Sequence, residues 1–358
     1  MSLDSNPNIK DVAKVAGVSF KTVSRVLNND KAVSEELRTR VAAAIRTTGY
    51  VPNAGARAMR SGKSGVVGFL SDVIATTPYS FEIVHGVQDA LAECGLSMLM
   101  GNTGGNPEQE ARQVNLFLQS RVDGIIFASM FHKEVELPEI PPGIATVTVN
   151  CFDRAGALSA VVPDDEQIGR TAAEYLIGKG HRRIAYLTLT KNIIATKLRT
   201  CGFMQAVKAA GLPAAGVSVR PSRRITSKGD EISLAGKMIC ELFDAPGEPT
   251  AILAANDPEA MPIMASLRRL GLSIPGDVSV LGIDDYRLIC ERMDPPLTSI
   301  GLPYYEMGRR AVELLLQPEE PGRDVRIERI PGPLVERESV AKPKRAPSGG
   351  KFARVMNL

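Results

Sequence analysis

The sequence predicts two folded parts: an N-terminal all-α headpiece built on a helix-turn-helix, and an α/β domain with two lobes, each a doubly wound parallel sheet. Two short helical patterns flank a glycine turn at residues 17–19, which is helix-turn-helix spacing. Beyond residue 65, short Val- and Ile-rich runs alternate with helical patterns, as is typical of parallel sheets covered by helices on both faces. There are roughly nine such runs. That is more strands than a single sheet usually contains, so we expect two lobes.

Charge is segregated along the chain, although the 358 residues together carry only +3. Residues 1–63 hold 11 Lys and Arg against 5 Asp and Glu, and residues 341–358 hold 5 against none. The residues between them are acidic, with 27 basic side chains against 35 acidic ones. A basic N-terminal module followed by an acidic domain indicates that the N-terminal part contacts a polyanion. Randomly scattered surface charge is the alternative.

Composition excludes several classes of protein. With 44% hydrophobic and 23% charged residues the chain is globular rather than disordered. No run approaches the roughly 18 apolar residues of a membrane helix, and the polar start MSLDSNPNIK lacks the apolar core of a signal peptide. We therefore expect a cytoplasmic protein with no membrane contact. Five dispersed cysteines without C-x-x-C and three histidines without H-E-x-x-H predict no disulfide framework, no metal site and no cofactor.

Three helices are predicted in the headpiece. Gly17 can end the first helix in the left-handed conformation, and Ser19 can cap the second. A third helix should begin at the Ser34 cap and end at Gly49. Apolar residues of the first two helices recur at three- and four-residue intervals, so their inner faces can pack together: Ile9, Val12, Ala13, Ala16, Val23, Val26 and Leu27.

The outer face of the second helix carries side chains that core packing does not require: Phe20, Lys21, Ser24, Arg25 and Asn28. Arg25 can donate a bidentate fork to guanine, Lys21 can donate to the same base, and Phe20 can contact a thymine methyl group. The face therefore predicts that this helix reads a DNA major groove. A solvated polar helix face is the alternative.

Residues 53–64 form a predicted hinge helix and linker. Their Ala-rich stretch is short, and isolated helices of fewer than about 12 residues are marginal in water. We therefore expect this helix to form only when something holds it, as DNA would.

The large domain, residues 65–340, should place ligands where strands end. Helices are expected near residues 79–94, 107–119, 166–179, 195–210, 230–244, 257–270 and 304–316, and ligands of such sheets bind at the carboxyl ends of the strands. Polar side chains follow several strands and suit a polyhydroxylated ligand: Ser71, Asp72, Asn102, Ser129, Asn150, Asn256, Asp257, Asp284 and Asp285. Capping of the next helix is the alternative, and we expect it for Asp257, ahead of Pro258.

The motif IKDVAKVAGVSFKTVSRVLNN, followed by VS and GYVPN, resembles the headpiece of the lactose-repressor (LacI/GalR) family of bacterial transcription factors. The resemblance implies a two-lobed domain like that of periplasmic binding proteins, and it places Phe20, Lys21 and Arg25 at base-reading positions. The resemblance also implies five contacts to the DNA backbone, from Thr22, Ser24, Asn28, Ser34 and Asn53. It implies that Ala56 and Met59 of the hinge enter the minor groove, and Met59 replaces the leucine that is usual in the family.

The elements TKLRTCGF, AILAANDPEA, VLGIDD and PPLTSI also match that family. The match implies effector contacts from Asn150, Arg199, Asn256 and Asp284, and from Tyr79 at a position that is often aromatic. Ser80 replaces the second aromatic and the chain has no tryptophan, so the sequence leaves the effector open within sugars and related polar metabolites. Alternatively, Arg199 and Asp284 form a buried ion pair across an empty cleft.

These observations predict a sequence-specific transcriptional regulator, and by default a repressor. It would bind a pseudo-palindromic double-stranded operator as a homodimer under effector control. The expected domains are residues 1–52, 53–64, 65–340 and a disordered basic tail, 341–358, which lacks the leucine heptads of a tetramer. One alternative is a solute-binding protein of the same architecture without DNA function. The other alternative is an enzyme that uses the glycine-rich turn at residues 101–105. No acid–base constellation and no G-x-S-x-G motif accompanies this turn, so we expect no catalysis.

Overall fold

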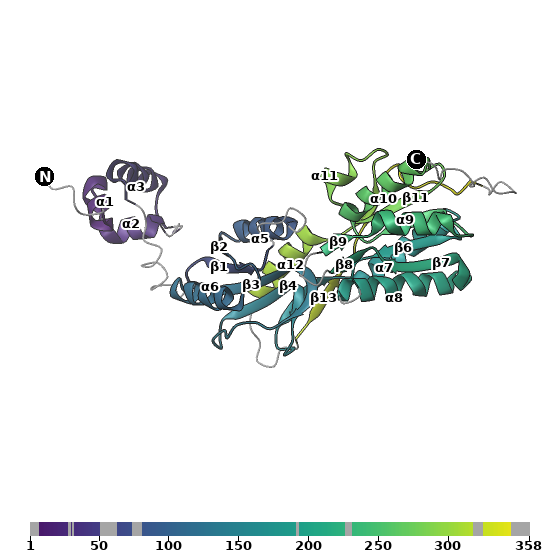
Figure 1. The fold of residues 1–358 in the computed structure, drawn as a ribbon. Helices are drawn as coiled ribbons and strands as arrows, with labels where there is room; N and C mark the ends of the chain where they lie inside the picture. The colour runs from purple at the N-terminus through teal and green to yellow at the C-terminus, as the bar shows by residue number, and fades with distance from the viewer. Residues whose placement is uncertain are drawn as a thin grey trace. The chain divides into compact units, whose positions relative to one another are not determined.

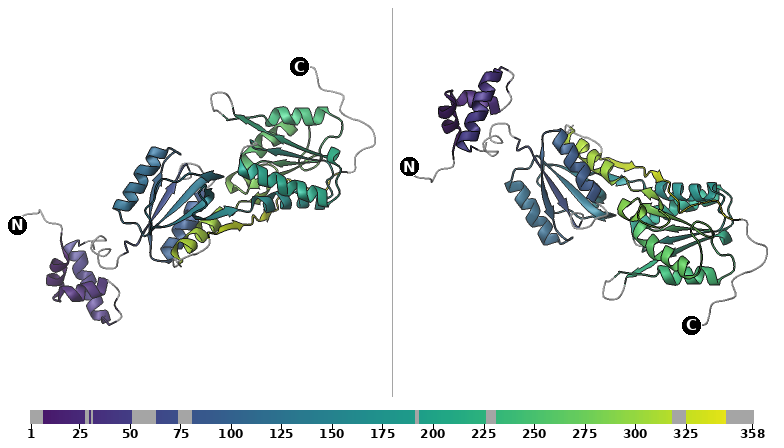
Figure 2. Two further views of the ribbon diagram at one scale, coloured as in Figure 1. Left: turned by 90° about the horizontal axis from the view of Figure 1, so that it is seen from below. Right: turned by 90° about the horizontal axis from the view of Figure 1, so that it is seen from above.

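The computed structural model divides into two compact units, Met1–Gly65 and Val66–Leu358, which we describe separately (Figure 1, Figure 2). It describes residues 7–27, 30, 32–50, 63–73, 81–190, 193–225, 231–317 and 325–344. Most of the predicted hinge lies outside these residues. So do five of the predicted site residues: Asn28, Asn53, Ala56, Met59 and Tyr79.

The headpiece contains the three predicted helices, α1 (Ile9–Ala16), α2 (Phe20–Leu27) and α3 (Glu35–Thr48). The predicted caps are present: Gly17 is left-handed at φ 63°, Ser19 Oγ accepts from Thr22 N at 3.1 Å, and Ser34 caps α3. The helices bury a small apolar core between them, which explains the three- and four-residue spacing of its members: Val12, Ala13, Ala16, Val23, Val41 and Ala44.

The first lobe of the large unit is a six-stranded parallel sheet in the order β13-β5-β4-β3-β1-β2. Helices α5 and α12 cover one face and α6 the other, so the inner strands are buried on both faces, whereas the edge strand β2 is largely exposed. Figure 1 shows α12 and β13, which come late in the chain, lying among the early elements of this lobe. The bounds are β1 (Val66–Ser71), α5 (Phe81–Glu93), β2 (Ser97–Asn102), α6 (Pro107–Gln119), β3 (Gly124–Val135), β4 (Ala145–Asp153), β5 (Ser159–Pro163), α12 (Tyr304–Leu316) and β13 (Ile327–Ile330).

The second lobe has a six-stranded sheet in the order β14-β12-β11-β10-β6-β7, in which only β14 pairs antiparallel. Helices α7 and α8 cover one face, and α9 and α10 cover the other. The bounds are α7 (Asp165–Gly178), β6 (Ile184–Thr188), α8 (Ile194–Ala209), η2 (Ala214–Gly216), β7 (Val217–Pro221), α9 (Ala235–Asp244), β10 (Ala251–Ala254), α10 (Asp257–Arg269), β11 (Ser279–Asp284), α11 (Arg287–Cys290), β12 (Thr298–Gly301) and β14 (Leu334–Val335).

The chain crosses between the lobes three times, after β5, after β12 and after β13. Hydrogen bonds join the crossings to one another: Asp164 N donates to Ile330 O at 2.8 Å, and Gly301 N donates to Pro333 O at 2.7 Å. The C-terminal segment therefore ties the lobes together, by contributing β13 to one sheet and β14 to the other.

Two details differ from the sequence-based expectation. The helix expected to begin near residue 230 begins at Ala235, because residues 231–233 form β9, which pairs with β8 (Arg223–Ile225) as a hairpin. Residues 341–344, assigned above to a disordered tail, pack on the second lobe instead. His181 Nε2 lies 2.9 Å from Ala341 O, and Lys344 Nζ lies 3.2 Å from Asp277 Oδ1. The rest of that predicted tail lies outside the described residues.

Within the described part of the chain, we find no helix with the length and apolar composition that crossing a bilayer requires.

Helices α7 and α8 pack so closely that their backbones touch at two glycines. A Cβ on Gly202 would lie 1.8 Å from Glu166 O, and one on Gly169 would lie 1.9 Å from Arg199 O. The spacing of these two helices, and with it the position of Arg199, therefore depends on two residues that lack a side chain.

We expect Gly202→Ala to lower the free energy of unfolding by about 1–3 kcal/mol or more, because the new methyl group cannot be accommodated without moving a backbone. Urea titration followed by circular dichroism measures this. Gly178→Ala in α7 is the matched control, since nothing lies within 4 Å of its Cβ position. It should be neutral or stabilising by about 0.5–1 kcal/mol. Equal stability of the two variants would contradict the packing argument.

Candidate functional site

The outer face of α2 is a solvent-exposed, basic surface. Phe20 is 53% exposed although it is a large aromatic residue, and Lys21 is exposed beside it. The Arg25 side chain is 66% exposed, and its Nε lies 3.3 Å from Asp30 Oδ2. A shallow depression runs over this face and the start of α1, and it is lined by Ile9, Lys10, Ser19, Phe20, Lys21, Thr22, Ser24 and Arg25. The three predicted base-reading residues therefore lie together on one accessible surface.

Two of the residues predicted to contact the DNA backbone lie at helix starts. Thr22 contacts the residue that caps α2, and Ser34 itself caps α3. Thr22 Oγ1 lies 3.0 Å from Ser19 Oγ, at the start of α2. Ser34 Oγ accepts from Leu37 N at 3.5 Å, at the start of α3. Both helices therefore begin at exposed residues, where the positive end of the helix dipole favours a phosphate.

A second candidate site lies between the lobes of the large unit, as a cavity of about 220 Å³. Four of the five predicted effector contacts line it, from both sheets; the fifth, Tyr79, lies outside the described residues. The wall is mixed, with apolar, amide and charged groups: Met130, Phe131, His132, Asn150, Leu189, Ile193, Ala195, Arg199, Arg223, Asn256, Pro258, Asp284, Leu302 and Tyr304.

Arg199 pairs with Asp165 and not with Asp284, the partner that the sequence offered as an alternative. Its Nε donates to Asp165 Oδ1 at 2.6 Å, and no hydrogen bond or ion pair between Arg199 and Asp284 occurs among the described residues. Burial alone would raise the pKa of Asp165, but the charge of Arg199 and a hydrogen bond from His132 outweigh it and hold that pKa below its usual value. Burial also disfavours the charged form of Arg199. The negative charge of Asp165 and further neighbouring groups outweigh this effect and raise the pKa of Arg199. The pair is therefore ionised.

Asn150 and Asp284 lie at strand ends in unusual backbone conformations, with φ of 55° and 117°. The Asn150 amide donates to Ser129 O and to Met130 O, both at 2.9 Å, so its remaining polar atom is the carbonyl oxygen. Burial, together with the charge of Asp257, raises the pKa of Asp284 well above its usual value. Residues other than glycine in this conformation are uncommon and cluster at functional sites.

The expectation that Asp257 caps α10 is wrong. Asn256 is the cap, with its Oδ1 accepting from Glu259 N at 3.0 Å, and Asn256 also lines the cavity. Asp257 is fully buried and accepts from Ser299 Oγ and Tyr286 N, each at 2.7 Å. Burial raises the pKa of Asp257 to about 6. Asp257 thus holds the loop after β11 in place, next to Asp284.

Sequence reasoning missed Arg223, which lines the cavity from the base of the β8–β9 hairpin. Its Nε donates to Glu259 Oε2 at 3.2 Å, and this buried carboxylate also accepts from Ser222 Oγ at 2.8 Å and Ser233 Oγ at 2.9 Å. The rule that ligands bind where strands end could have found Arg223, because it follows β7 by two residues.

His132, Phe131 and Tyr304 were missed as well. The first two lie where β3 leaves its register with β4, between Ala128 and Lys133, which the sequence pattern did not reveal. Tyr304 begins α12 directly after an interlobe crossing.

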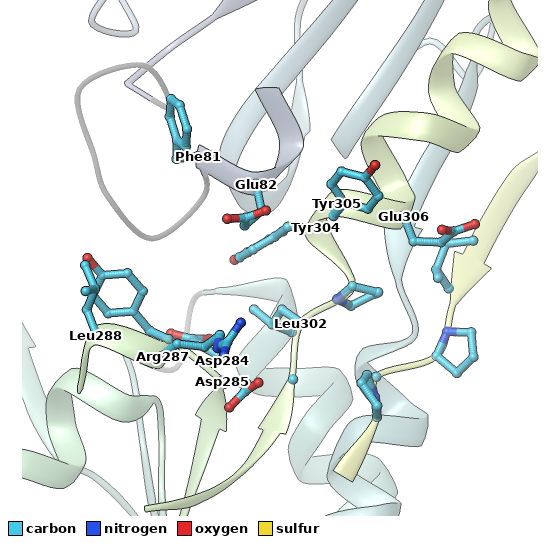
Figure 3. A pocket seen from close by; sticks show the side chains of 17 residues that line it. Phe81, Glu82, Asp284, Asp285, Arg287, Leu288, Leu302, Tyr304, Tyr305 and Glu306 are labelled. Atoms are coloured by element: carbon cyan, nitrogen blue, oxygen red, sulfur yellow. The ribbon is translucent and has the colours of Figure 1, made fainter. Parts of the chain in front are cut away.

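A wider pocket of about 1000 Å³ adjoins the cavity and shares Asp284, Leu302 and Tyr304 with it. Figure 3 shows Phe81 and Glu82 on one side of this pocket, Asp284, Asp285 and Arg287 on the other, and Tyr304 between them. We interpret it as the mouth of the interlobe site. Its aromatic wall includes Phe81, the residue that follows the predicted Tyr79–Ser80 pair.

Two family models match the chain. The model of bacterial regulatory proteins of the lacI family matches residues 8–53, and the model of periplasmic binding proteins and the sugar-binding domain of the LacI family matches residues 64–337. The first match contradicts the alternative of a solute-binding protein without a DNA-binding part.

Individual proteins agree with the family models. The ribose operon repressor of Escherichia coli K12 is 33% identical over 311 residues, which cover 86% of this chain and 92% of the relative. A putative LacI-family regulator from Rhizobium etli superposes with a TM-score of 0.72 at 32% identity, over 78% of this chain and all of that one. The regulator CelR in complex with cellobiose superposes with a TM-score of 0.62 at 28% identity, over 93% and 99%. The chain therefore belongs to the LacI family of bacterial DNA-binding transcriptional regulators.

Proposed function

We propose that this protein is a repressor that binds a pseudo-palindromic operator as a homodimer, with its operator affinity controlled by a small polar effector, most simply a carbohydrate. The observation that carries the proposal is the exposed face of α2, where Phe20, Lys21 and Arg25 project together from a headpiece whose core does not need them. A dimer would place two such helices in successive major grooves, about one helical turn of DNA apart.

In this proposal the remaining headpiece residues position the protein on the duplex. Thr22, Ser24, Asn28, Ser34 and Asn53 contact phosphates, which fixes the register without reading sequence. Ala56 and Met59 enter the minor groove from the hinge, where an apolar side chain can wedge between base steps. The exposed first turns of α2 and α3 support the phosphate contacts of Thr22 and Ser34.

The effector would occupy the interlobe cavity, with Arg199, Asn150, Asn256 and Asp284 as polar contacts and Tyr79 as an aromatic one. The similar proteins named above include a ribose operon repressor and a cellobiose complex, which supports a sugar. The cavity wall combines guanidinium, amide and carboxyl groups with apolar side chains, which suits the hydroxyl groups and C–H faces of a sugar ring.

Effector control requires that the ligand bind one arrangement of the lobes better than another, because only differential affinity shifts a conformational equilibrium. A coupling of about 1–3 kcal/mol between the effector and operator sites is typical of such proteins. We further propose that the protein acts on DNA in the cytoplasm and has no catalytic role.

Selection of bound sequences from random duplex DNA, repeated with ribose, cellobiose, sucrose and other metabolites, tests the proposal directly. A pseudo-palindromic consensus whose occupancy changes with one compound is the expected result. Equally weak, salt-sensitive binding to every duplex would overturn it.

Arg25→Ala should weaken binding to the selected operator by about 1–3 kcal/mol and relax base preference at one position of each half-site, because a bidentate contact to a base edge is lost. Fluorescence anisotropy with a set of single-base operator variants measures both effects. Arg46→Ala is the matched control, since Arg46 is an exposed arginine in the last turn of α3 and does not line the depression over α2. If Arg25→Ala weakened binding to all duplexes equally, Arg25 would not read a base.

Arg199→Ala should leave selective operator binding intact and abolish its response to the active sugar. Loss of a charge-assisted hydrogen bond should weaken sugar binding by about tenfold to a hundredfold. Titration calorimetry and operator titrations with and without the sugar measure the two effects, and circular dichroism checks folding. Arg170→Ala is the control, because this exposed arginine of α7 pairs with Glu166, donates to Gln205 and does not line the cavity. An unchanged response in Arg199→Ala would remove the pocket assignment.

A further inference from the structure

A chain of three buried side chains links the two lobes beside the cavity. His132 belongs to β3 of the first lobe, while Asp165 opens α7 and Arg199 lies on α8, both in the second lobe. The His132 Nδ1 atom lies 2.7 Å from Asp165 Oδ2, and Arg199 Nε lies 2.6 Å from the other oxygen, Oδ1. The three side chains are at most 7% exposed.

We propose that His132 is a positioning residue that couples the arrangement of the lobes to the effector-binding Arg199, through the shared carboxylate of Asp165. The inference deepens the proposed effector control and rests on it. His132, Asp165 and Arg199 are together called the interlobe bridge below.

The first-lobe end of the bridge is held rigidly. The bulged segment 129–133 of β3 carries His132, and Asp72 binds it at three points: Ser129 Oγ at 2.7 Å, Met130 N at 2.9 Å and Lys133 Nζ at 3.1 Å. Asn150 binds the same segment through the carbonyl oxygens of Ser129 and Met130. Because these bonds anchor the segment within the lobe, His132 moves with the first lobe as a body.

The second-lobe end is equally constrained. Asp165 follows the first interlobe crossing directly, and Asp164 caps the same helix by accepting from Gln167 N at 3.0 Å. The backbones of α7 and α8 touch at Gly169, against the carbonyl oxygen of Arg199. The distance between Asp165 and Arg199 is therefore set by helix packing within one lobe. Of the two hydrogen bonds in the bridge, the one between His132 and Asp165 spans the lobes.

This geometry makes the bridge sensitive to lobe movement. A hydrogen bond of 2.7 Å is lost when its atoms separate by about 1 Å, so even a small rotation of the lobes breaks it. Asp165 is fully buried, and a buried carboxylate that loses a donor is destabilised. The same carboxylate orients the guanidinium that lines the cavity, so a ligand bound to Arg199 acts on the carboxylate that His132 holds.

Buried His181 provides a matched comparison for His132. It is 1% exposed and bonded on both ring nitrogens, to Thr250 Oγ1 and Ala341 O, both at 2.9 Å, but all of these groups belong to the second lobe. Replacing either histidine removes a satisfied buried imidazole. Only the His132 replacement breaks a contact between the lobes.

The native cysteines offer a direct measurement of lobe arrangement in the full-length protein. Cys94 is exposed in the first lobe, and Cys201 and Cys240 are exposed in the second. Cys151 and Cys290 are buried, and burial raises the pKa of their thiols, so we expect neither to take up a label. In a Cys201→Ser variant, spin labels attached to Cys94 and Cys240 place one label in each lobe. Mixing the labelled protein with unlabelled protein suppresses signals between the subunits of a dimer.

We expect His132→Ala to broaden or shift the distance distribution between the labels on Cys94 and Cys240. It should also change the affinity for the selected operator by about tenfold without any ligand, as the loss of a hydrogen bond to a charged group predicts. The sign of that change shows whether the bridged arrangement is the one that binds DNA. His132→Gln keeps a donor and should restore part of both effects, whereas His181→Ala should lower thermal stability and change neither.

The bridge is refuted if His132→Ala lowers stability but leaves the label distances as they are in the parent protein. If the distances change and operator affinity does not, the coupling to DNA is refuted. Absence of selective DNA binding by the parent protein would instead overturn the proposed function, and the distance measurement would still decide the bridge.

Discussion

The ligand-binding half of this molecule depends on one buried charge pair, Arg199 with Asp165. A guanidinium withdrawn from water is costly unless a carboxylate meets it with good geometry, and here one does at 2.6 Å. The pair can form only because α7 and α8 approach to backbone contact at Gly169 and Gly202. Helix packing, the charge state of the cavity wall and the contact to His132 in the other lobe are therefore consequences of the same arrangement.

Parallel topology explains why polar groups gather around that pair. The carboxyl ends of parallel strands meet at one edge of a sheet, and both lobes direct that edge toward the cavity. The polar residues found there divide into two kinds. Arg199, Asn256 and Asp284 line the cavity, while Asp72 and Asp257 lie behind it and bind the loops that carry the lining residues. A site with such support keeps its geometry when empty, which lowers the cost of ordering it on binding.

The headpiece is governed by a different balance. Its core is small, and its functional face is polar and exposed, so charge rather than apolar burial decides what it binds. Segregation of basic residues into the N-terminal unit keeps the attraction for DNA apart from the acidic large domain, where buried carboxylates are needed for internal bonding. Effector control is the means by which two units with such different chemistry would act together.

The sequence by itself determined the local elements and the family. Apolar periodicity, Gly17, Ser19 and Ser34 predicted the headpiece helices and their caps, and the seven helices expected in the large domain lie within a few residues of their predicted places, whereas the β8–β9 hairpin, α11 and β12 were not predicted. These features are local, so spacing and turn chemistry along the chain are enough to predict them.

Only the tertiary structure decided which charged groups meet. Asp165 rather than Asp284 partners Arg199, Asn256 rather than Asp257 caps α10, and His132 and Arg223 enter the cavity wall. Each of these outcomes depends on contacts between residues that are distant in sequence or on a shift of strand register, and neither leaves a periodic signal in one sequence. Pairing of buried charges is a property of packed helices and sheets, because the penalty for an unpaired charge arises only after the fold has excluded water.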